Sequence, residues 1–581
     1  MNFKLRLLAL LLLVMMVFTS CSLESVMQYI PFLGGDVEQT TTTTTTVAPT
    51  TTKPTTVKPP VQDEPEFDVS MNQTSKSELE ASYTLTQEEV DALMALLDEM
   101  VETSMIAETV DEVDALYEQF ETAYYHIAQQ RTIAMIIYYY NMVDEVASER
   151  YLEAVDMFYD IHDKYTLSLQ AMYQESPLSD QIFEGWSEEE LKSLEEYNPA
   201  VTQLSKDIDA LQVEYDQLSQ SDPNFNTRCI EIYKQLILKN NALARLNGYD
   251  NYYDYAAKNV YERDYERDEL AAFREYLVEY VVPYYNEIHN YAYSYEGWTS
   301  NTKKSRVDEF LNKPFYSSSK RNYLIKYLDS LEGTMGEGMR DVFESKNCIF
   351  SYNTNSHPTA FQTYLYEDDT PFCFFGSSGQ SASTVAHEIG HYYAAYTNPD
   401  IDNYDLCETH SQGNEYLFLT YCKDILSEDI YKVVRANGIA DALRIMIIAT
   451  VIDEFEQNVY LLDDATVNAM TSEDFDEIMR KVCEPYGGDA WVKTVTNPYA
   501  YWRLVCISNP VYYISYAVSA SAALEILALA EADYDLALES YTKLVEGITP
   551  EDGFLGALAK AGLTTPFEEE TFINIGEILS K

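Results

Sequence analysis

Positive charge is scarce in this sequence. Its 581 residues include 38 lysines and arginines against 96 aspartates and glutamates, which gives a net charge of −58. So acidic a surface repels phosphate groups, which argues against nucleic acid as a partner and against anionic lipid as a ligand of the folded body. The same negative field would attract cationic peptides to any cleft that shares it.

Cysteines and long apolar runs are also few. The chain has 8 cysteines and no C-x-x-C pair, and beyond Cys21 their number is odd, so at least one is free. Cys348 and Cys373 flank a strand-like region and could pair with each other. The apolar run from Leu7 to Phe18 has 12 residues, too few to cross a bilayer, and no later run is long enough. We therefore expect no membrane-spanning helix.

The N-terminus predicts where the protein works. Residues 1–6 are basic, the apolar run follows, and Thr19-Ser20-Cys21 closes it. This order resembles a bacterial lipoprotein signal peptide, residues 1–21, whose cleavage would leave Cys21 as a lipid-modified N-terminus. We expect an extracytoplasmic protein with a lipid anchor in the cell membrane. The alternative is an ordinary secretory signal with an incidental cysteine.

Residues 22–75 have the composition of a disordered tether. Within them, residues 40–60 contain 12 threonines and 4 prolines. Such a segment cannot bury enough apolar surface to offset the entropy lost on ordering. We expect a Thr/Pro-rich spacer that holds the folded body away from the membrane.

The rest of the sequence favours helix nearly throughout. Capping boxes begin at Thr86 and Ser187, and apolar residues between Leu204 and Leu218 recur at intervals of four and three, which is typical of a packed helix. Strand-like residues occur only at about 348–376. These patterns predict a mainly α-helical fold with a small β-sheet.

The length of this helical part allows one large body with a substantial core, built from two lobes. We place a helical N-terminal lobe at residues 76–340 and a C-terminal lobe, which carries the motifs described next, at residues 341–581.

Histidine is rarer still, yet two of the 7 histidines stand four residues apart in His387-Glu388-Ile389-Gly390-His391. Positions i and i+4 share one face of a helix, so both imidazoles can hold the same metal ion. Glu388 stands beside them and could deprotonate a metal-bound water. This H-E-x-x-H motif is the minimum apparatus of a zinc hydrolase that attacks amide bonds. The alternative is an amphipathic helix with two hydrogen-bonded histidines.

A catalytic zinc needs three protein ligands and one open position. A turn signal at 397–400 and an apolar run at 406–419 predict a second helix that returns antiparallel to the first. Glu408 on that helix is the predicted third ligand. Glu415 shares its face and would orient a ligating imidazole, or it is a solvated surface charge.

Two more residues of these helices carry predictions. His410 points about 200° around the helix from Glu408, so we expect it on the surface or in packing and not on the metal. Gly390 costs about 1 kcal/mol relative to alanine in a helix, which predicts the close approach of another backbone. The apolar strand Pro371–Phe375 is the candidate neighbour, and as an edge strand it could bind an extended peptide.

In this order and spacing the motifs resemble those of the thimet oligopeptidase and oligoendopeptidase F family of zinc metallopeptidases. The likeness covers roughly residues 180–580. The stretches that carry it are His387–His391, Glu408–Glu415, Asn241–Tyr252, Tyr486-Gly487-Gly488, and Trp502-Arg503 followed by Tyr512 and Tyr516.

The resemblance implies a metalloendopeptidase that hydrolyses short oligopeptides in a deep cleft between two helical lobes. We expect the protein to be a monomer. The Zn²⁺ ligands would be His387, His391 and Glu408, and Glu388 would be the general base. Tyr512 and Tyr516 would donate hydrogen bonds to the tetrahedral oxyanion or to the substrate. Because the two tyrosines stand four residues apart on a predicted helix, both can face one cleft.

The sequence departs from the family pattern at Cys506. A histidine usually stands there, a few residues after the arginine that matches Arg503. A cysteine cannot supply a cationic imidazole to a transition state. The alternative function is therefore a lipoprotein of the same fold that binds peptides with weak turnover or none.

Overall fold

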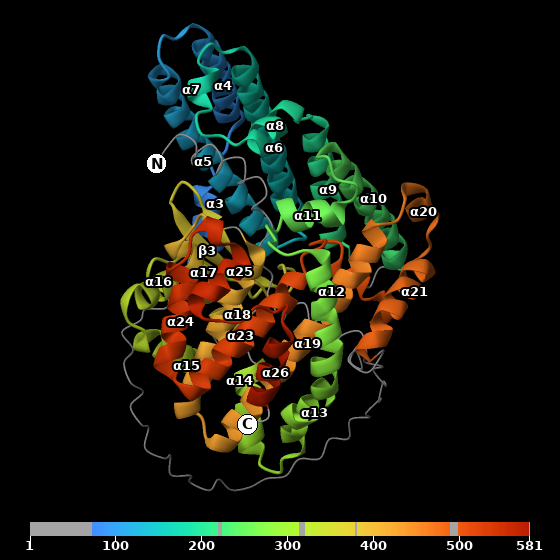
Figure 1. Ribbon diagram of the computed structural model, residues 1–581. Helices are drawn as coiled ribbons and strands as arrows, with labels where there is room; N and C mark the ends of the chain where they lie inside the picture. The colour runs from blue at the N-terminus through green and yellow to red at the C-terminus, as the bar shows by residue number, and fades with distance from the viewer. Residues whose placement is uncertain are drawn as a thin grey trace, which may run out of the picture.

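The computed structural model describes residues 72–218, 223–312, 320–377, 380–401, 403–487 and 498–579. The predicted signal peptide with Cys21, most of the predicted tether and Gly488 lie outside the described residues. The described part is mainly helical with one small sheet, as predicted (Figure 1).

The elements follow one another in a simple order. The helices before the sheet are α3 (Lys76–Ser82), α4 (Gln87–Ile106), α5 (Asp111–Tyr140), α6 (Glu145–Glu175), α7 (Ser179–Ile182), α8 (Glu188–Glu196), α9 (Ala200–Asp216), α10 (Phe225–Leu246), α11 (Tyr252–Asn259), α12 (Arg267–Tyr276), α13 (Val282–Ala292), α14 (Asn301–Asn312), α15 (Lys320–Ser330) and α16 (Gly333–Glu344). The strands are β1 (Cys348–Phe350), β2 (Ala360–Leu365) and β3 (Thr370–Phe375). The helices after the sheet are α17 (Ala382–Thr397), α18 (Tyr404–Tyr421), α19 (Glu428–Tyr460), α20 (Asp464–Ala469), α21 (Ser472–Cys483), α22 (Trp502–Val505), α23 (Ile514–Ala532), α24 (Tyr534–Glu546), α25 (Gly553–Ala561) and α26 (Glu569–Leu579).

Two helix starts follow directly from local sequence chemistry. The Thr86 side chain accepts a hydrogen bond from the Glu89 amide while the Glu89 carboxylate accepts one from Thr86, which closes the capping box of α4. Ser187 and Glu190 do the same at α8. Each box satisfies backbone N–H groups that the first helical turn leaves without partners, so both predicted starts are confirmed.

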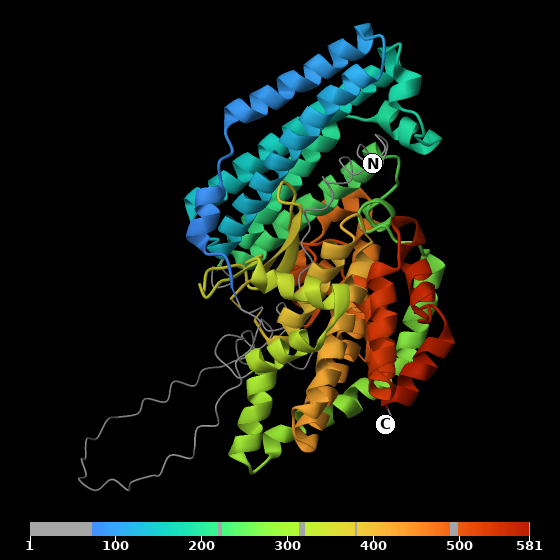
Figure 2. The ribbon, with the colours of Figure 1, turned by 90° about the vertical axis from the view of Figure 1, so that its left-hand side faces the viewer.

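The first helices form a layer at one end of the molecule. Figure 2 shows α4, α5 and α6 lying together across the top of the view, away from the C-terminal helices. Their facing side chains, among them Leu97, Phe120 and Phe158, are fully buried and make a core of their own. On α9, the predicted apolar stripe is also in the interior, with Ile208 and Leu211 buried.

The sheet has the order β1-β3-β2, with β1 parallel and β2 antiparallel to β3. The strand at 371–375 is therefore central, and its prediction as a peptide-binding edge strand is wrong, because both of its sides are hydrogen-bonded to neighbours. Cys348 and Cys373 stand opposite each other in the register of β1 and β3, but both are free thiols, so the suggested disulfide is absent.

The largest core surrounds α23, which packs against α18 and α19. Within the described residues, α23 is long and apolar enough to cross a membrane by composition alone. However, 78 % of its apolar stretch is buried inside the protein, which is the environment of a core helix. This core contains residues from Ile208 to Ile575, on both sides of the predicted lobe boundary at residue 340, and that boundary stays a prediction.

Candidate metal centre

The H-E-x-x-H segment lies on α17, and α18 packs beside it in the opposite direction. Ser383 near the start of α17 bonds Glu415 late in α18, whereas Gly390 further along α17 meets His410 earlier in α18. A Cβ atom at Gly390 would stand 2.8 Å from the His410 carbonyl oxygen and 2.8 Å from the Ser411 Cα. The glycine therefore admits the backbone of α18, and not that of the preceding strand as the sequence suggested.

The two helices bring His387, His391 and Glu408 together. His387 Nε2 lies 3.2 Å from His391 Nε2 and 3.3 Å from Glu408 Oε2, and His391 Nε2 lies 3.6 Å from the same oxygen. Two ligands of a tetrahedral zinc at ordinary bond lengths stand about 3.3–3.6 Å apart. The three donors thus have the chemistry and the spacing of a zinc site, and all three side chains are buried.

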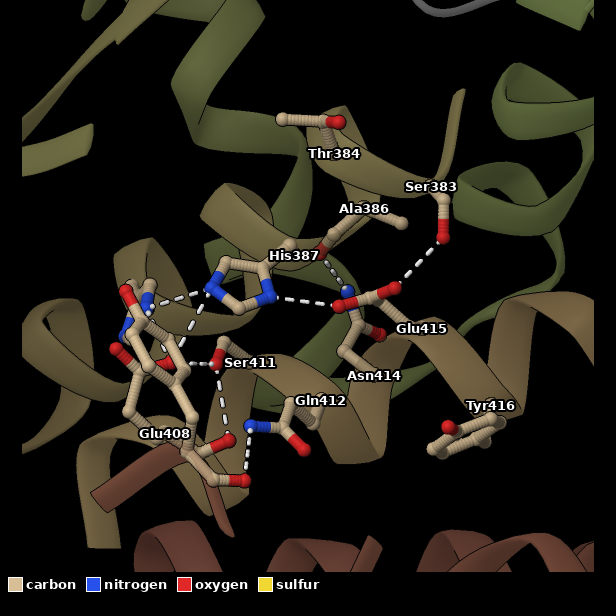
Figure 3. A network of polar contacts seen from close by, with 12 residues as sticks. Ser383, Thr384, Ala386, His387, Glu408, Ser411, Gln412, Asn414, Glu415 and Tyr416 are labelled. Atoms are coloured by element: carbon tan, nitrogen blue, oxygen red, sulfur yellow. Dashed lines mark hydrogen bonds and ion pairs between the residues drawn. The ribbon is translucent and has the colours of Figure 1, made fainter. Parts of the chain in front are cut away.

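A second set of polar contacts holds these donors in place. His387 Nδ1 donates to Glu415 Oε1 at 2.6 Å, and the Ser383 hydroxyl donates to Glu415 Oε2 at 2.6 Å (Figure 3). The Ser411 hydroxyl donates to Glu408 Oε2 at 3.0 Å. Glu415 therefore fixes the ring of His387 with Nε2 turned toward the other donors, which is the usual arrangement behind a metal-binding imidazole.

Glu388 is fully buried beside the cluster. Neither of its carboxylate oxygens has a hydrogen-bond partner among the described residues. Burial raises the pKa of this carboxyl well above its usual value. A buried carboxyl group without a hydrogen-bond partner opposes folding. A general base works best when its pKa is close to the working pH, so a raised pKa makes this carboxylate a better base near neutral pH.

The two predicted tyrosines meet at the start of α23. Tyr512 lies just before the helix and Tyr516 in its first turn, so the prediction of one helix for both is wrong for Tyr512. Their rings still touch edge to face, with centroids 5.1 Å apart. The Tyr512 hydroxyl donates a hydrogen bond to Glu408 Oε1, whereas the histidine nitrogens lie nearest to the other carboxylate oxygen, Oε2. Tyr516 lines the same pocket as His387.

His410 and Cys506 lie away from the donors. His410 is buried, with Nε2 at 3.0 Å from the Leu544 carbonyl oxygen, so it is a packing residue and its predicted surface option is wrong. Cys506 follows α22, is 1 % exposed and contacts Tyr233. Burial raises the pKa of its thiol well above the usual value, so the thiol is neutral.

Sequence reasoning missed the residues that hold the Tyr512 backbone. Val511 has φ +66°, a left-handed conformation that a β-branched residue adopts only under constraint. The Arg263 guanidinium donates to the Val511 carbonyl at 2.7 Å, and the Tyr261 hydroxyl donates to the Pro510 carbonyl at 2.6 Å. Nothing in the local sequence around Arg263 indicates a partner about 250 residues away.

Arg263 also faces a buried acid. Its side chain is 1 % exposed and its Nε lies 3.9 Å from Asp405, which is completely buried near the start of α18. Replacing Arg263 by methionine leaves Asp405 without this cation, so we expect the free energy of unfolding to fall by about 3–5 kcal/mol. Urea denaturation followed by circular dichroism measures the change.

The matched control is Arg267→Met. Arg267 pairs with Asp254 at the surface, with 39 % of its side chain exposed, and exposed pairs contribute about 0–1 kcal/mol. An equal loss of stability in both variants would contradict the role assigned to Arg263.

Comparison with solved structures finds proteins of the same fold. A PZ peptidase A, solved with an inhibitor, has a TM-score of 0.67 at 18 % identity, covering 87 % of this chain and 99 % of its own. A Bacillus anthracis strain Ames protein named as an oligoendopeptidase F has a TM-score of 0.66 at 16 % identity, covering 86 % of this chain and 96 % of its own. Another structure named as an oligoendopeptidase F has a TM-score of 0.63 at 16 % identity, with coverages of 88 % and 97 %.

No protein-family model and no curated protein matches the sequence. At 16–18 % identity the structural likeness establishes the fold. It confirms the mainly helical architecture that the sequence predicted and supports the family resemblance of its motifs.

Proposed function

We propose that this protein is a zinc metalloendopeptidase of the oligoendopeptidase F type that hydrolyses short oligopeptides. The observation that carries the proposal is the buried set of three donors on α17 and α18, whose mutual distances of 3.2, 3.3 and 3.6 Å suit one tetrahedral zinc. The names of the structural neighbours supply the substrate class.

Each residue of the site has a distinct role in this proposal. His387, His391 and Glu408 hold Zn²⁺, which when bound supplies a Lewis acid that makes water a nucleophile near neutral pH. Glu388 takes the proton that this water loses as it attacks the peptide carbonyl, and returns it to the leaving amine. Glu415 keeps His387 in the tautomer that leaves Nε2 free to bind.

The two tyrosines divide their work. Tyr512 donates its hydroxyl hydrogen bond to Glu408 and so orients a proposed metal ligand. Tyr516 shares the pocket of His387 and is the candidate donor to the oxyanion that forms on the substrate carbonyl. From the sequence alone, both tyrosines were expected to donate hydrogen bonds to the oxyanion or to the substrate. The proposal now assigns that role to Tyr516 alone.

The alternative is a peptide-binding lipoprotein without turnover, and Cys506 favours it because a neutral, buried thiol cannot replace an imidazolium. Glu388 favours the enzyme. Its buried carboxyl has no hydrogen-bond partner among the described residues, and it directly follows the donor His387, where a general base would act. The anchoring of the body through Cys21, its extracytoplasmic location and its monomeric state are likewise part of the proposal.

Removal of metal tests the proposed function. The full-length protein is treated with a chelator and assayed with quenched fluorescent oligopeptides before and after zinc is added. We expect cleavage to cease and then return, and the melting temperature to rise with zinc because the ion binds the folded state. Unchanged cleavage in the metal-free protein would contradict zinc catalysis. Peptide capture without cleavage, in the presence of zinc, would support the alternative.

A further inference from the structure

A pocket begins at His387 and extends away from the donor cluster between α14, α17, α18 and α19. It has about 840 Å³ of empty space, part of it open to solvent. Ser383 and Tyr516 lie at the metal end together with His387. His387 forms part of its wall, whereas His391, Glu408 and Glu388 do not, so the pocket adjoins the donor set at one residue. It is therefore within reach of a side chain next to a peptide bond held at the metal.

Most of the pocket wall is apolar. Phe310 comes from α14, Phe418 and Leu419 from α18, and Val434 and Ile445 from α19. These side chains form an extended apolar surface without hydrogen-bonding groups. They suit an occupant with a long aliphatic stem, such as leucine, methionine, lysine or arginine.

Two carboxylates interrupt this apolar wall. Glu415 is already bonded to His387 and Ser383, so both of its oxygens have partners. Among the described residues, Asp441 forms an ion pair with Arg444 alone, at 3.7 Å, and its side chain is 33 % exposed. No lysine or arginine is among the described residues that line the pocket.

The electrostatic environment favours a cation at this point. Burial raises the pKa of the Asp441 carboxyl, Arg444 lowers it, and repulsion from Glu415, which lines the same pocket, raises it again. A cationic head between them relieves that repulsion, and the net charge of −58 attracts such a group from solution.

We propose that this pocket is a specificity subsite for a lysine or arginine side chain that flanks the scissile bond of the substrate peptide. The aliphatic stem lies along Phe310 and Phe418, and the cationic head pairs with Asp441. The inference rests on the proposed peptidase function, and it makes Asp441 the residue that selects the side chain.

The test compares lysine with norleucine, which has nearly the same stem and no charge. A quenched peptide series carries one or the other at each position in turn, and mass spectrometry locates the cleaved bond. Hydrogen bonds to charged groups contribute enough to give about a 10- to 100-fold ratio. We therefore expect the full-length protein to prefer lysine by that factor in kcat/KM at one position beside the cut.

Asp441→Asn, which keeps the shape and removes the charge, should reduce that preference to within about 3-fold while norleucine peptides are cleaved as before. The matched control is Glu428→Gln, on the same helix but paired at the surface with Lys432, which should keep the full preference. Equal cleavage of lysine and norleucine peptides by the unaltered protein would overturn the proposal. So would a preference that survives in Asp441→Asn.

A binding measurement separates this inference from the proposed function. The metal-free protein is titrated with the same lysine and norleucine peptides, and the two dissociation constants are compared. Tighter binding of the lysine peptide that Asp441→Asn abolishes supports the subsite even if no peptide is cleaved. Cleavage without any charge preference in either assay overturns the subsite and leaves the peptidase in place.

Discussion

Glu388→Gln is expected to lower kcat/KM for oligopeptides by about 100- to 10,000-fold, the range that a positioned general base contributes. The amide keeps the size and the burial of the side chain but cannot accept the proton that the attacking water loses. Steady-state cleavage of a quenched fluorescent peptide by the full-length protein measures the loss.

Measurements of zinc content and stability test whether activity is lost because the general base is missing, and not because the variant loses metal or unfolds. Glu388 is not among the three donors, so the variant should bind zinc at the same stoichiometry. Its melting temperature should not fall, because the amide keeps the size of a buried carboxyl that has no hydrogen-bond partner among the described residues. The matched control, Glu539→Gln, neutralises an exposed carboxylate and should keep full activity. Near-normal turnover in Glu388→Gln would remove this residue from the reaction.

Tyr516→Phe is expected to lower kcat by about 100- to 1000-fold with little change in KM, which is the effect of losing one donor to a developing oxyanion. The hydroxyl is the only atom removed, so the apolar contacts of the ring remain. Zinc affinity should be unchanged because Tyr516 is not one of the three donor residues. Initial-rate kinetics over a range of peptide concentrations separate kcat from KM.

Tyr512→Phe distinguishes the roles of the two tyrosines. Its hydroxyl bonds Glu408, so its loss should weaken zinc binding by about 10- to 100-fold, as with other groups that orient metal ligands. Competition with a fluorescent zinc chelator measures the affinity. If Tyr512→Phe binds zinc normally and only kcat falls, then Tyr512 acts on the substrate, as the sequence alone suggested.

The parts of the site that lie close together in sequence were predictable. The i, i+4 spacing of His387 and His391 places both imidazoles on one helical face whatever surrounds the helix. The turn after α17 and the helix that follows predicted the return of Glu408 and Glu415 to that face. The capping boxes likewise predicted where α4 and α8 begin, because a cap involves only residues three apart.

Other expectations failed because they depended on packing. Gly390 was correctly expected to admit another backbone, but that backbone belongs to α18. The strand at 371–375 has the composition of a strand, but its place in the centre of the sheet depends on partners more than six residues away on both sides. Tyr512 lies outside the helix, next to Val511, whose backbone has a left-handed conformation.

The sequence by itself thus determined the class of fold, and it predicted the three residues that the structure brings together and the candidate base, since each prediction follows from local spacing and residue chemistry. Only the tertiary structure decided how Arg263 holds the Tyr512 backbone, where Tyr512 directs its hydroxyl, and that Asp441 faces the same pocket as His387. These arrangements bring together residues 54 to 249 positions apart. Such contacts form only when whole helices pack, and no periodicity along the chain encodes which distant side chains then meet.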